Sequence, residues 1–372
     1  MIKVGITGNK GFIGSYLYNW LRTKNESIEL ITFDKDFFGN PNRLKEFVNQ
    51  CDVIVHLAAM NRHPDPQVIY DTNVGLVRTL LIACETSESN PKIIFSSSSQ
   101  EDRDNLYGRS KKEGRELFED FAEKNGSGFT SFTIPNVFGP FGKPNYNSFI
   151  ATFCHKIVHD ETPEVFQDAE VGLIYVQELV EIIENEISIS DKTIKTLALQ
   201  PTTYVKVTEV LKKLLYYKQI YLLDGQVPQM EGLFGLQLFN TFRSYIPSSE
   251  FLRKFTCHTD SRGAFVEVMR AGVSGQSSFS TTHPGITRGN HYHTRKVERF
   301  AVIKGKALIQ LRKVGTNEVF EYHLDGEDPA YVDMPIWFTH NIKNIGDGEL
   351  ITLFWINEPY NPADPDTYFE VV

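Results

Sequence analysis

Hydrophobic and polar positions follow different rhythms in the two halves of this chain. Up to about residue 145, short apolar runs alternate with segments whose apolar residues recur every three or four positions, the period of an amphipathic helix. The apolar runs have the length of buried parallel strands and cover residues 3–7, 29–33, 52–58 and 92–98. The helical segments lie between them, at residues 11–23, 42–50 and 74–87. This order predicts an α/β fold: a doubly wound, Rossmann-type parallel sheet with helices on both faces.

The helical rhythm weakens after this region and then stops. We expect further helices at residues 148–160, 176–186 and 207–215, and a helix followed by a linker at 234–249. From about residue 251 the chain shows short alternating strands with turn signals, at residues 265–269, 300–313, 319–326 and 349–357. This second pattern predicts an all-β barrel or jelly roll. The sequence thus predicts two domains, residues 1–248 and 249–372.

Composition and charge exclude some functions. Hydrophobic residues make up 41% of the 372 residues and the formal net charge is −9, so the chain lacks the broad basic surface typical of nucleic-acid binding. The four cysteines, Cys51, Cys84, Cys154 and Cys257, are scattered as buried free thiols of a reducing cytosol would be. No stretch approaches the roughly 20 apolar residues of a membrane span, and no leader begins the chain. We expect a cytoplasmic protein without membrane insertion.

The segment TGNKGFIG places Gly8, Gly11 and Gly14 directly after a strand and at the start of a helix. Such glycines allow a tight turn, a close backbone approach to a pyrophosphate and close packing of helix on strand. The amides that open the helix, at Phe12 and Ile13, then face the phosphates. This spacing in this context predicts a dinucleotide-binding loop.

Asp34 ends the second strand, where a carboxylate can accept hydrogen bonds from the adenosine ribose hydroxyls. That role favours NADH, because the carboxylate would repel the 2′-phosphate of NADPH. Lys35 is adjacent and can partly offset this charge. The residues alone therefore leave the choice between NADPH and NADH open.

Tyr107 and Lys111 are four residues apart on a helix that follows a strand ending in serines, so they share one helical face. A nearby cation lowers the pKa of an acid by roughly 1–3 units, which suits Tyr107 to protonate a carbonyl oxygen as hydride reaches its carbon. Ser98 is the serine expected to hydrogen-bond the same carbonyl, with Ser97 and Ser99 as its neighbours. The pattern predicts a reductase triad.

TGNKGFIG, HLAAMNR, FSSSSQ, YGRSK and PNVFG resemble the extended short-chain dehydrogenase/reductases, which act mostly on nucleotide-sugars. The resemblance covers roughly the first 245 residues. It implies a homodimer and an NADPH or NADH site that includes residues 57–59. It also implies that Asn136 orders the active site, while Thr133 stands where many relatives carry arginine. The implied cofactor residues of the HLAAMNR motif are Leu57, Ala58 and Ala59. The segment 143–147, with Lys143, Asn145 and Asn147, is implied to meet the sugar nucleotide together with Asn61.

His291 and His293 are two residues apart, so on a strand they point to the same face. Glu298 can reach that space from the same hairpin region, and His340 can reach it from a later strand. Three imidazoles and a carboxylate suit a divalent transition metal with open coordination positions. His283 and His323 fall outside this group.

The same stretch resembles the cupin family, through the pattern G-x5-H-x-H-x4-E-x6-G from Gly285 to Gly305. A second cupin motif is present in part, with Pro335, His340 and Asn344 in place and Trp337 replacing the usual glycine. The order of the two halves, a reductase-like half followed by a cupin-like half, resembles that of the bifunctional enzymes of capsule and O-antigen synthesis. That resemblance implies zinc as the metal, although the ligand set also suits iron, manganese or nickel.

The resemblance to the bifunctional enzymes implies a UDP-4-keto-6-deoxy-N-acetyl-L-hexosamine as substrate. The cupin domain would epimerise it at C3 and the reductase domain would reduce the C4 ketone, giving UDP-N-acetyl-6-deoxy-L-talosamine, a precursor of UDP-N-acetyl-L-fucosamine. Since a C3 hydrogen is acidic only beside a ketone, epimerisation must precede reduction. Tyr331 or a water molecule is a candidate base, while Tyr292 should point away from the metal. A purely structural metal-binding cupin, a metal-dependent oxygenase and a non-catalytic regulator are the alternatives.

Overall fold

The computed structural model describes residues 1–260, 263–266, 268–269, 275–358 and 360–372, with the backbone alone at 257–260 and 263–266. Packing divides the chain into two compact units. The first contains residues 1–138, 142–149 and 168–207, and the second contains residues 139–141, 150–167 and 208–372. Helices that follow the first unit in sequence are thus grouped with the C-terminal strands, and the domain boundary expected at residue 248 stays a prediction.

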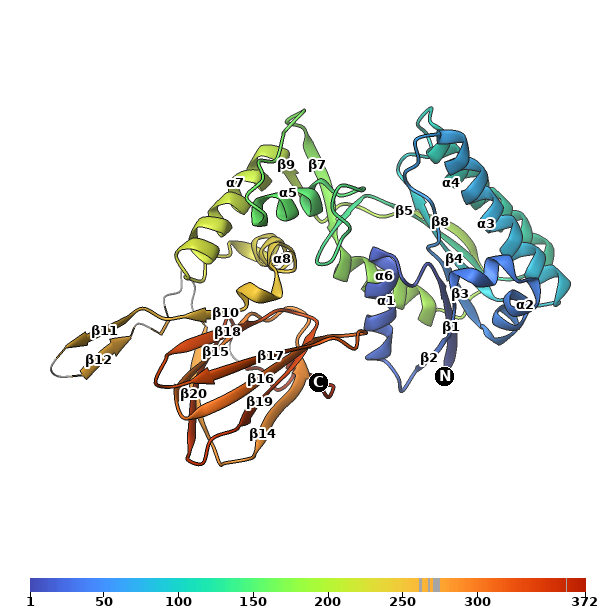
Figure 1. The fold of residues 1–372 in the computed structure, drawn as a ribbon. Helices are drawn as coiled ribbons and strands as arrows, with labels where there is room; N and C mark the ends of the chain where they lie inside the picture. The colour runs from blue at the N-terminus through green and yellow to red at the C-terminus, as the bar shows by residue number, and fades with distance from the viewer. Residues whose placement is uncertain (261–262, 267, 270–274, 359) are drawn as a thin grey trace. The chain divides into compact units, whose positions relative to one another are not determined.

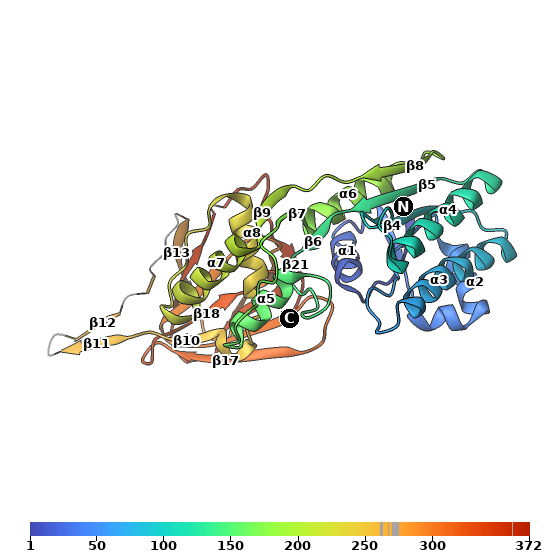
Figure 2. The same cartoon turned by 90° about the horizontal axis from the view of Figure 1, so that it is seen from above.

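The first unit is built on a parallel sheet with strand order β2-β1-β3-β4-β5-β8. Its strands are β1 (Ile2–Thr7), β2 (Ile28–Ile31), β3 (Val53–His56), β4 (Lys92–Ser98), β5 (Phe129–Ile134) and β8 (Ile194–Ala198). The helices are α1 (Phe12–Arg22), α2 (Pro41–Gln50), α3 (Pro66–Thr86), α4 (Leu106–Asn125) and α6 (Val176–Ser188), with a short η1 (Lys35–Gly39). Helices α1 and α6 cover one face, and α2, α3 and α4 cover the other (Figures 1 and 2). The predicted doubly wound sheet is confirmed.

The central strands are apolar because both of their faces are covered. All four residues of β3 are buried, and aromatic side chains such as Phe95, Phe118 and Phe129 pack beside them. His56 ends β3, and its Nδ1 lies 3.0 Å from the Thr7 hydroxyl at the end of β1. Strand order reverses between β1 and β3, and open α/β sheets bind their ligands at such a reversal.

A small three-stranded sheet completes the first unit, with strands β6 (Asn136–Phe138), β7 (Glu170–Tyr175) and β9 (Thr203–Lys206). The remaining helical elements are α5 (Phe149–Val158), α7 (Val207–Tyr217), η2 (Lys218–Leu223), α8 (Gly232–Arg243) and η3 (Ser248–Glu250). The helices expected at 148–160, 176–186 and 207–215 are therefore confirmed. No helix of the described residues is long and apolar enough to cross a bilayer.

The second unit carries two five-stranded sheets, with orders β10-β18-β15-β20-β13 and β17-β16-β19-β14-β21. The first sheet contains β10 (Leu252–Lys254), β13 (Gln276–Thr282), β15 (Glu298–Lys304), β18 (Ala330–Met334) and β20 (Leu350–Ile356). The second contains β14 (Thr287–Tyr292), β16 (Lys306–Lys313), β17 (Val319–Asp325), β19 (Phe338–Asn344) and β21 (Tyr368–Phe369). All pairings within both sheets are antiparallel. The predicted jelly roll is confirmed.

Two details differ from the expected strands of the second unit. The segment 300–313 forms two strands rather than one, because Gly305, at φ +86°, turns the chain between β15 and β16. The strand expected at 265–269 overlaps β12 (Gly263–Val266), which pairs with β11 (Cys257–Asp260), while residue 267 lies outside the described residues. Cys51, Cys84 and Cys154 are buried free thiols, and the Cys257 side chain lies outside the described part.

Within the second unit, a buried polar cluster joins helical residues to the outer face of the barrel. Asp333 on β18 accepts hydrogen bonds from Arg299 Nε at 2.8 Å and Nη2 at 3.0 Å, and from the Tyr221 hydroxyl of η2 at 2.5 Å. Arg243 of α8 donates to the Met334 carbonyl at 2.9 Å. We call Tyr221, Arg243, Arg299 and Asp333 the barrel clasp. It holds η2 and α8 against β15 and β18.

Candidate functional site

The glycine-rich loop joins β1 to α1 at the carboxyl edge of the parallel sheet. Gly8 has φ +77°, and a Cβ at this position would lie 2.8 Å from the Ala58 amide nitrogen. A Cβ on Gly14 would lie 2.1 Å from the Gly8 carbonyl oxygen, so only glycine lets α1 pack this closely. Gly11 is the N-cap of α1 and offers no side chain to the amides that follow at residues 12–13. A helix N-terminus of this kind suits a pyrophosphate.

The residues implied beside the cofactor do lie next to this loop. Residues 57–59 follow β3, and the Leu57 amide donates to the Thr7 carbonyl at 3.2 Å. The Ala58 amide donates to the Thr7 hydroxyl at 3.4 Å. The carboxyl ends of β1 and β3 are thus tied together where the strand order reverses, and both border the expected dinucleotide position.

Asp34 follows β2 and contacts a cation of the glycine loop. Its Oδ2 accepts a hydrogen bond from Lys10 Nζ at 2.7 Å, and its Oδ1 accepts one from the Asp36 amide at 3.2 Å. The Lys10 bond holds the pKa of Asp34 below its usual range. Lys10, rather than the adjacent Lys35, is therefore the main offsetting charge. The pair presents a carboxylate for ribose hydroxyls and an ammonium for a 2′-phosphate. The preference for NADPH over NADH therefore stays a prediction.

The structure separates the three serines at the end of β4. The Ser97 hydroxyl donates to Glu101, and Ser99 is exposed. Ser98 is buried, accepts a hydrogen bond from the Gln100 amide at 3.2 Å and is hydrogen-bonded to Tyr107. This geometry supports Ser98 over its two neighbours as the serine of the reductase site.

Tyr107 and Lys111 lie one turn apart on α4, as the spacing predicts, but the pKa of Tyr107 shifts in the opposite direction. Burial raises the pKa of Tyr107 to about 12, and the hydrogen bond with Ser98 opposes that rise. Lys111 Nζ donates to the Ser96 carbonyl at 2.8 Å and lies 6.0 Å from the centre of the Tyr107 ring. Burial also lowers the pKa of Lys111 to about 8. Desolvation thus outweighs the expected effect of the ammonium, and Tyr107 is a protonated acid at neutral pH.

The segment expected to meet the sugar lies beside the end of the HLAAMNR motif. The Asn61 amide donates to the Tyr146 hydroxyl at 3.2 Å, and Arg62 Nη1 donates to the Asn145 carbonyl at 3.1 Å. Lys143 Nζ lies 5.2 Å from the centre of the Tyr146 ring. Residues far apart in sequence thus form one wall near the reductase residues.

Two other predicted substrate residues have less defined surroundings. Asn136 and Asn147 are exposed. Asn136 starts β6, and its Nδ2 donates to the Gly172 carbonyl at 3.5 Å. Among the described residues no hydrogen bond joins Asn136 to Tyr107, so its ordering role stays a prediction.

Sequence reasoning missed Asn73, which positions residues of this site. Asn73 is buried in α3, where its side chain bonds the Met60 amide at 2.7 Å, the Met60 carbonyl at 3.0 Å and the Ser110 hydroxyl at 3.1 Å. The Ser110 hydroxyl donates to the Tyr107 carbonyl at 2.7 Å. Asn73 therefore ties α3 to the loop after β3 and to α4. Asn73 follows Asp71 and Thr72 and precedes the segment 74–87 expected to be helical, so no sequence pattern distinguished it.

The four residues expected to bind metal come together between the two sheets of the second unit. His291 lies on β14 and His340 on β19, in one sheet, while Glu298 lies on β15 in the other, and His293 directly follows β14. One ligand atom from each lies within 4.8 Å of the others. Three strands and one loop thus converge on a single point, and all but His291 are fully buried.

A β-bulge in β14 makes this convergence possible. Gly289 pairs with Asn341, but His291 pairs with His340, so Asn290 is an extra residue and adopts φ +61°. Without the bulge, His291 would oppose Thr339 and would lie on the other face from His340. The register shift places both imidazoles on the same face.

The chemistry of these four side chains fits a metal cation. Nε2 of His293, Nε2 of His340 and Oε2 of Glu298 are buried and have no hydrogen-bond partner among the described residues. Glu298 Oε2 lies 3.0 Å from His293 Nε2 and 3.4 Å from His340 Nε2. Buried polar atoms without partners are costly, and a cation bound between them would satisfy all three.

The electrostatics of His291 and Glu298 agree with this fit, whereas burial alone would lower the pKa of His293 but the Glu298 carboxylate outweighs it and raises that pKa. Burial lowers the pKa of His291 to about 4, so its imidazole is neutral and able to bind a metal at neutral pH. Burial alone would raise the pKa of Glu298, but the neighbouring His293 outweighs it and holds that pKa well below its usual range. The carboxylate is therefore ionised, as a metal ligand must be.

Trp337 stands where cupins usually have glycine, and it keeps the backbone conformation of a glycine, with φ +60°. It is 2% exposed, its amide donates to the His293 carbonyl at 2.8 Å, and its ring stacks on Tyr292 with centroids 5.4 Å apart. Tyr292 also stacks on Tyr368 at 5.3 Å, so it points away from the metal ligands as expected. The aromatic stack offsets the left-handed strain.

Tyr331 is excluded as the base at this site. It pairs with Ala301 while Glu298 pairs with Met334, so Tyr331 and Glu298 lie on opposite faces of the sheet. The Tyr331 ring lies 3.8 Å from the Arg299 guanidinium, on the side of the barrel clasp. The water alternative stays open.

Comparison with known proteins extends over the whole chain. The NAD dependent epimerase/dehydratase family matches residues 4–184, and the Polysaccharide biosynthesis C-terminal domain matches residues 258–368. A UDP-2-acetamido-2,6-beta-L-arabino-hexul-4-ose reductase of Pseudomonas aeruginosa is 33% identical over 371 residues, covering 99% of this chain and 98% of that protein. A spore coat polysaccharide biosynthesis protein SpsL of Bacillus subtilis is 26% identical over 31% of this chain and 83% of its own length.

The crystal structure of the capsular polysaccharide assembling protein CapF from Staphylococcus aureus is 35% identical, covers 100% of both chains and has a TM-score of 0.62. A structure of CapF with the inhibitor 3-isopropenyl-tropolone is 33% identical over the same extent, with a TM-score of 0.57. Full-length similarity at this level, with both halves matched in the same order, establishes common descent. The chain belongs to the CapF-like family of polysaccharide-biosynthesis proteins, in which an NAD-dependent epimerase/dehydratase domain precedes a polysaccharide biosynthesis C-terminal domain.

Proposed function

We propose that this protein is a bifunctional UDP-sugar enzyme of capsule or O-antigen synthesis. Its C-terminal barrel, a cupin, inverts C3 of a UDP-4-keto-6-deoxy-N-acetyl-L-hexosamine, and its N-terminal domain then reduces the C4 ketone with NADPH. The product is UDP-N-acetyl-6-deoxy-L-talosamine, a precursor of UDP-N-acetyl-L-fucosamine. The observation that carries the proposal is the presence, in one chain, of a Ser98–Tyr107–Lys111 reductase group and a His291–His293–Glu298–His340 cluster. The similarity to a UDP-hexulose reductase supports the substrate class.

The order of the two reactions follows from the acidity of the sugar. A hydrogen on C3 can be removed only while C4 is a ketone, because the carbonyl delocalises the charge left on C3. Reduction of C4 abolishes that acidity and preserves the new configuration at C3. One chain therefore carries both sites because they act in turn on one keto-sugar.

In the reductase domain, the chain's residues bind, orient and protonate. Gly8, Gly11 and Gly14 allow the backbone to approach the pyrophosphate of the dinucleotide, which supplies hydride when bound. Ser98 holds the ketone oxygen, and Tyr107 donates its hydroxyl proton to that oxygen. A pKa of about 12 keeps Tyr107 protonated before the reaction.

In the barrel, the three imidazoles and the carboxylate would hold zinc or another divalent transition metal. Such a cation supplies Lewis-acid stabilisation of the charge on the C4 oxygen as the C3 proton leaves. His291, being neutral at physiological pH, and Glu298, being ionised, are in the protonation states that binding requires. Phe300 shares the inner face with Glu298 and packs 5.8 Å from the His340 ring, so it helps to exclude water.

Isotope exchange separates the two activities. The keto-sugar is incubated in heavy water with the zinc-loaded protein, without NADPH, and exchange of the C3 hydrogen is followed by NMR. We expect exchange in the native protein and in Tyr107→Phe, and none in His291→Ala or after removal of zinc. With NADPH added, the native protein should oxidise it and Tyr107→Phe should not. The matched controls are His323→Ala on β17 and the exposed Tyr204→Phe, which should keep both activities.

Absence of exchange in the native, metal-loaded protein, with NADPH oxidation intact, would contradict the epimerase and favour a 4-ketoreductase whose metal-binding cupin is purely structural. Loss of both activities in both variants, each still folded, would contradict the two-site division itself. NMR analysis of the product identifies the sugar.

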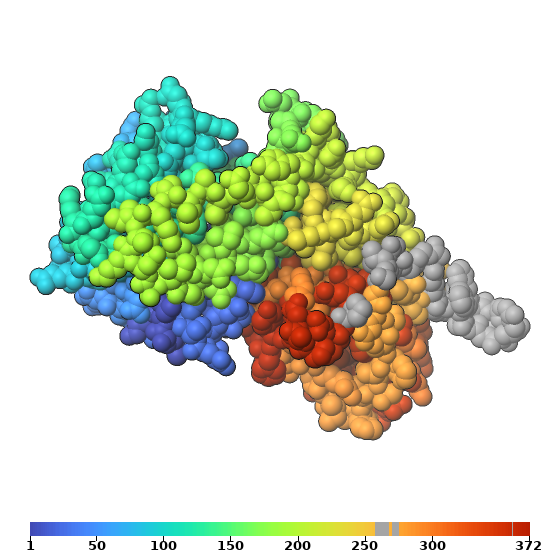
Figure 3. All heavy atoms as spheres, turned by 180° about the vertical axis from the view of Figure 1, so that it is seen from behind, coloured from blue at the N-terminus to red at the C-terminus, as the bar shows by residue number. Residues whose placement is uncertain are grey.

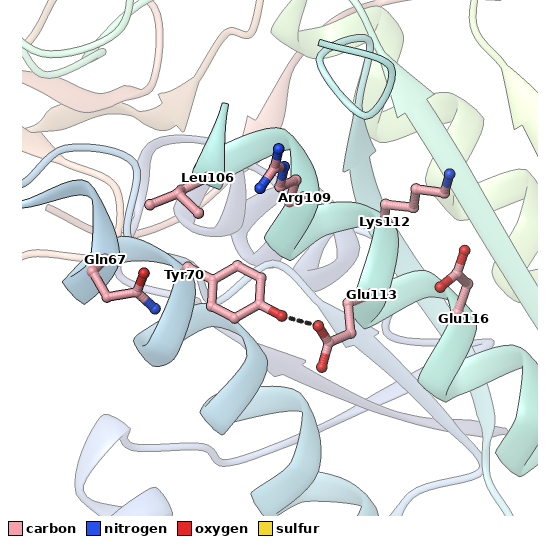
Figure 4. A pocket seen from close by; sticks show the side chains of 7 residues that line it. All are labelled: Gln67, Tyr70, Leu106, Arg109, Lys112, Glu113 and Glu116. Atoms are coloured by element: carbon pink, nitrogen blue, oxygen red, sulfur yellow. Dashed lines mark hydrogen bonds between the residues drawn. The ribbon is translucent and has the colours of Figure 1, made fainter. Parts of the chain in front are cut away.

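We also propose that the protein is a cytoplasmic homodimer paired through α3 and α4 of each subunit. The outer surface of these helices has a shallow hollow (Figure 4). Residues of both charges line it: Gln67, Tyr70, Leu106, Arg109, Lys112, Glu113 and Glu116. A surface with both charges can pair with a copy of itself. Analytical ultracentrifugation of the native protein and of Leu106→Glu tests this: a native monomer would contradict it.

A further inference from the structure

We propose that residues 364–372, here called the C-terminal strap, form the positioning element of the metal site, with Asp366 as its central residue. The strap contributes no metal ligand of its own. It fixes the loop and the bulge that aim His291 and His293. This inference rests on the metal site of the proposed function.

The Asp366 carboxylate is bound by the loop between the metal-binding histidines and Glu298. Its Oδ1 accepts hydrogen bonds from the Thr294 amide at 3.0 Å and the Thr294 hydroxyl at 2.6 Å. Its Oδ2 accepts from the Arg295 amide at 3.0 Å and the Lys296 amide at 3.2 Å. Asp366 is 3% exposed, so these four bonds form away from water. Successive amides that converge on one buried anion hold this loop in a single conformation.

The same residue orients His293 through its backbone. The Nδ1 of His293 is hydrogen-bonded to the Asp366 carbonyl oxygen. A carbonyl can only accept, so Nδ1 carries the proton, and Nε2 is left with the lone pair that a metal needs. That Nε2 faces Glu298 Oε2 at 3.0 Å. The carboxylate of Asp366 places this carbonyl, because the side chain is tied to the loop that follows His293.

The strap then continues along β14 to the bulge. β21 pairs with β14 through His291 and Phe369, and the Glu370 amide donates to the Asn290 carbonyl at 3.0 Å. Arg312 binds the Glu370 carboxylate at 2.9 Å. Since Asn290 is the extra residue that places His291 opposite His340, these contacts stabilise the register on which the site depends.

The exposure of the strap shows that it is not simply part of the core. Phe369 is 79% exposed and Val371 is 56% exposed. The C-terminal residues, shown in red in Figure 3, lie at the surface of the barrel. The strap therefore acts mainly through hydrogen bonds to the loop and bulge, with the stacking of Tyr368 on Tyr292 as an aromatic contact beside them.

The test measures metal affinity rather than turnover. Zinc affinity of the full chain is determined by competition with a chromophoric chelator for the native protein and for Asp366→Asn. Asparagine offers an NH2 group where Asp366 accepts amide protons, so two donors face each other. We expect affinity to fall by about 10- to 100-fold, the usual effect of losing an outer-shell partner. Asp328→Asn, outside the strap and with its carboxylate on the exposed Lys254 pair, is the matched control and should bind zinc like the native protein.

A second variant decides the question if Asp366→Asn does not fold. Thr294→Val removes one of the four hydrogen bonds to Asp366 without changing side-chain shape, and we expect zinc affinity to fall by about threefold or more. Thr294→Ser keeps the hydroxyl and should have native zinc affinity. In parallel, 15N NMR of the imidazoles should show His293 losing its single Nδ1-protonated form in Asp366→Asn. A purely structural strap would lower the stability of the metal-free protein and leave affinity and tautomer unchanged.

The outcomes separate this inference from the function on which it rests. A native protein that binds no zinc would overturn both. If the native protein binds zinc and Asp366→Asn binds it equally well, the role of the strap alone is overturned. Should Asp366→Asn not fold, native affinity in Thr294→Val has the same consequence.

Discussion

Replacing Asp333 by asparagine should destabilise the second unit more than any comparable substitution on the barrel surface. Asp333 is 5% exposed and Arg299 is 3% exposed, so this ion pair of the barrel clasp is shielded from water. Asparagine removes the charge and presents an NH2 group to a guanidinium that can only donate. Arg299 is then a buried cation without its counterion, and the Tyr221 hydroxyl loses an ionised acceptor.

The magnitude follows from that burial. Breaking a buried ion pair by removing one partner costs about 3–5 kcal/mol, against a total stability of about 5–15 kcal/mol for a domain. Burial alone would raise the pKa of Asp333, but Arg299 outweighs it and lowers that pKa. A carboxyl with a lowered folded pKa stabilises above its unfolded pKa of about 3.9. Its contribution is therefore complete at pH 7 and is lost as pH falls through the folded pKa.

Tryptophan fluorescence during urea unfolding measures this loss. Trp337 and Trp355 lie in the barrel, and Trp20, the third tryptophan, is changed to phenylalanine in every variant so that the signal reports the second unit. Asp328→Asn is the control, because its pair with Lys254 has side chains that are 64% and 69% exposed, and such pairs contribute about 0–1 kcal/mol. A combined Arg299→Met, Asp333→Leu and Tyr221→Phe variant should recover part of the loss, since the Arg299 charge is removed together with its counterion, while the buried Arg243 cation stays in place. If Asp333→Asn unfolds with a free energy within about 1 kcal/mol of Asp328→Asn, the reasoning is wrong.

Three further predictions concern the reductase domain. Burial lowers the pKa of Lys111 to about 8, so its ammonium is populated below that pH. The value of kcat/KM for ketone reduction, measured by stopped flow, should therefore fall above about pH 8. Lys111→Arg should move that fall to higher pH. Gly14→Ala places a Cβ 2.1 Å from the Gly8 carbonyl oxygen. It should weaken NADPH binding by tenfold or more, roughly the effect of one lost charge-assisted contact, as measured by fluorescence titration. Zinc affinity should stay unchanged and is the internal control. Lys10→Ala removes the ammonium that offsets Asp34 and should shift the ratio of kcat/KM values from NADPH towards NADH; an unchanged ratio would show that another cation meets the 2′-phosphate.

Some parts of the two sites were readable from spacing alone. Tyr107 and Lys111 share a helical face because four residues complete about one turn, and the structure confirms that placement. The strand–helix rhythm predicted the doubly wound sheet, since periodicity is a property of consecutive residues. The four metal-binding candidates were assembled from motif spacing, and their ligand atoms do converge.

Other parts depended on burial, which spacing does not encode. The sequence suggested that Lys111 would lower the pKa of Tyr107, yet desolvation raises it, because the phenol is withdrawn from water and Lys111 is directed to the Ser96 carbonyl. Tyr331 was a candidate base until strand pairing placed it on the outer face. Its side-chain chemistry was suitable, but the register of two strands far apart in sequence decided which face it occupies.

By itself, then, the sequence determined what consecutive residues control: the succession of strands and helices, the glycine-bearing turn and the residue types available for catalysis and metal binding. Tertiary structure decided which of those residues meet. The bulge at Asn290 sets the partner of His291, Lys10 reaches Asp34 across the loop, and Asp366 contacts His293 from 73 positions away. These contacts join segments distant along the chain, and no local pattern records them, because register, desolvation and long-range hydrogen bonds exist only once the strands have paired.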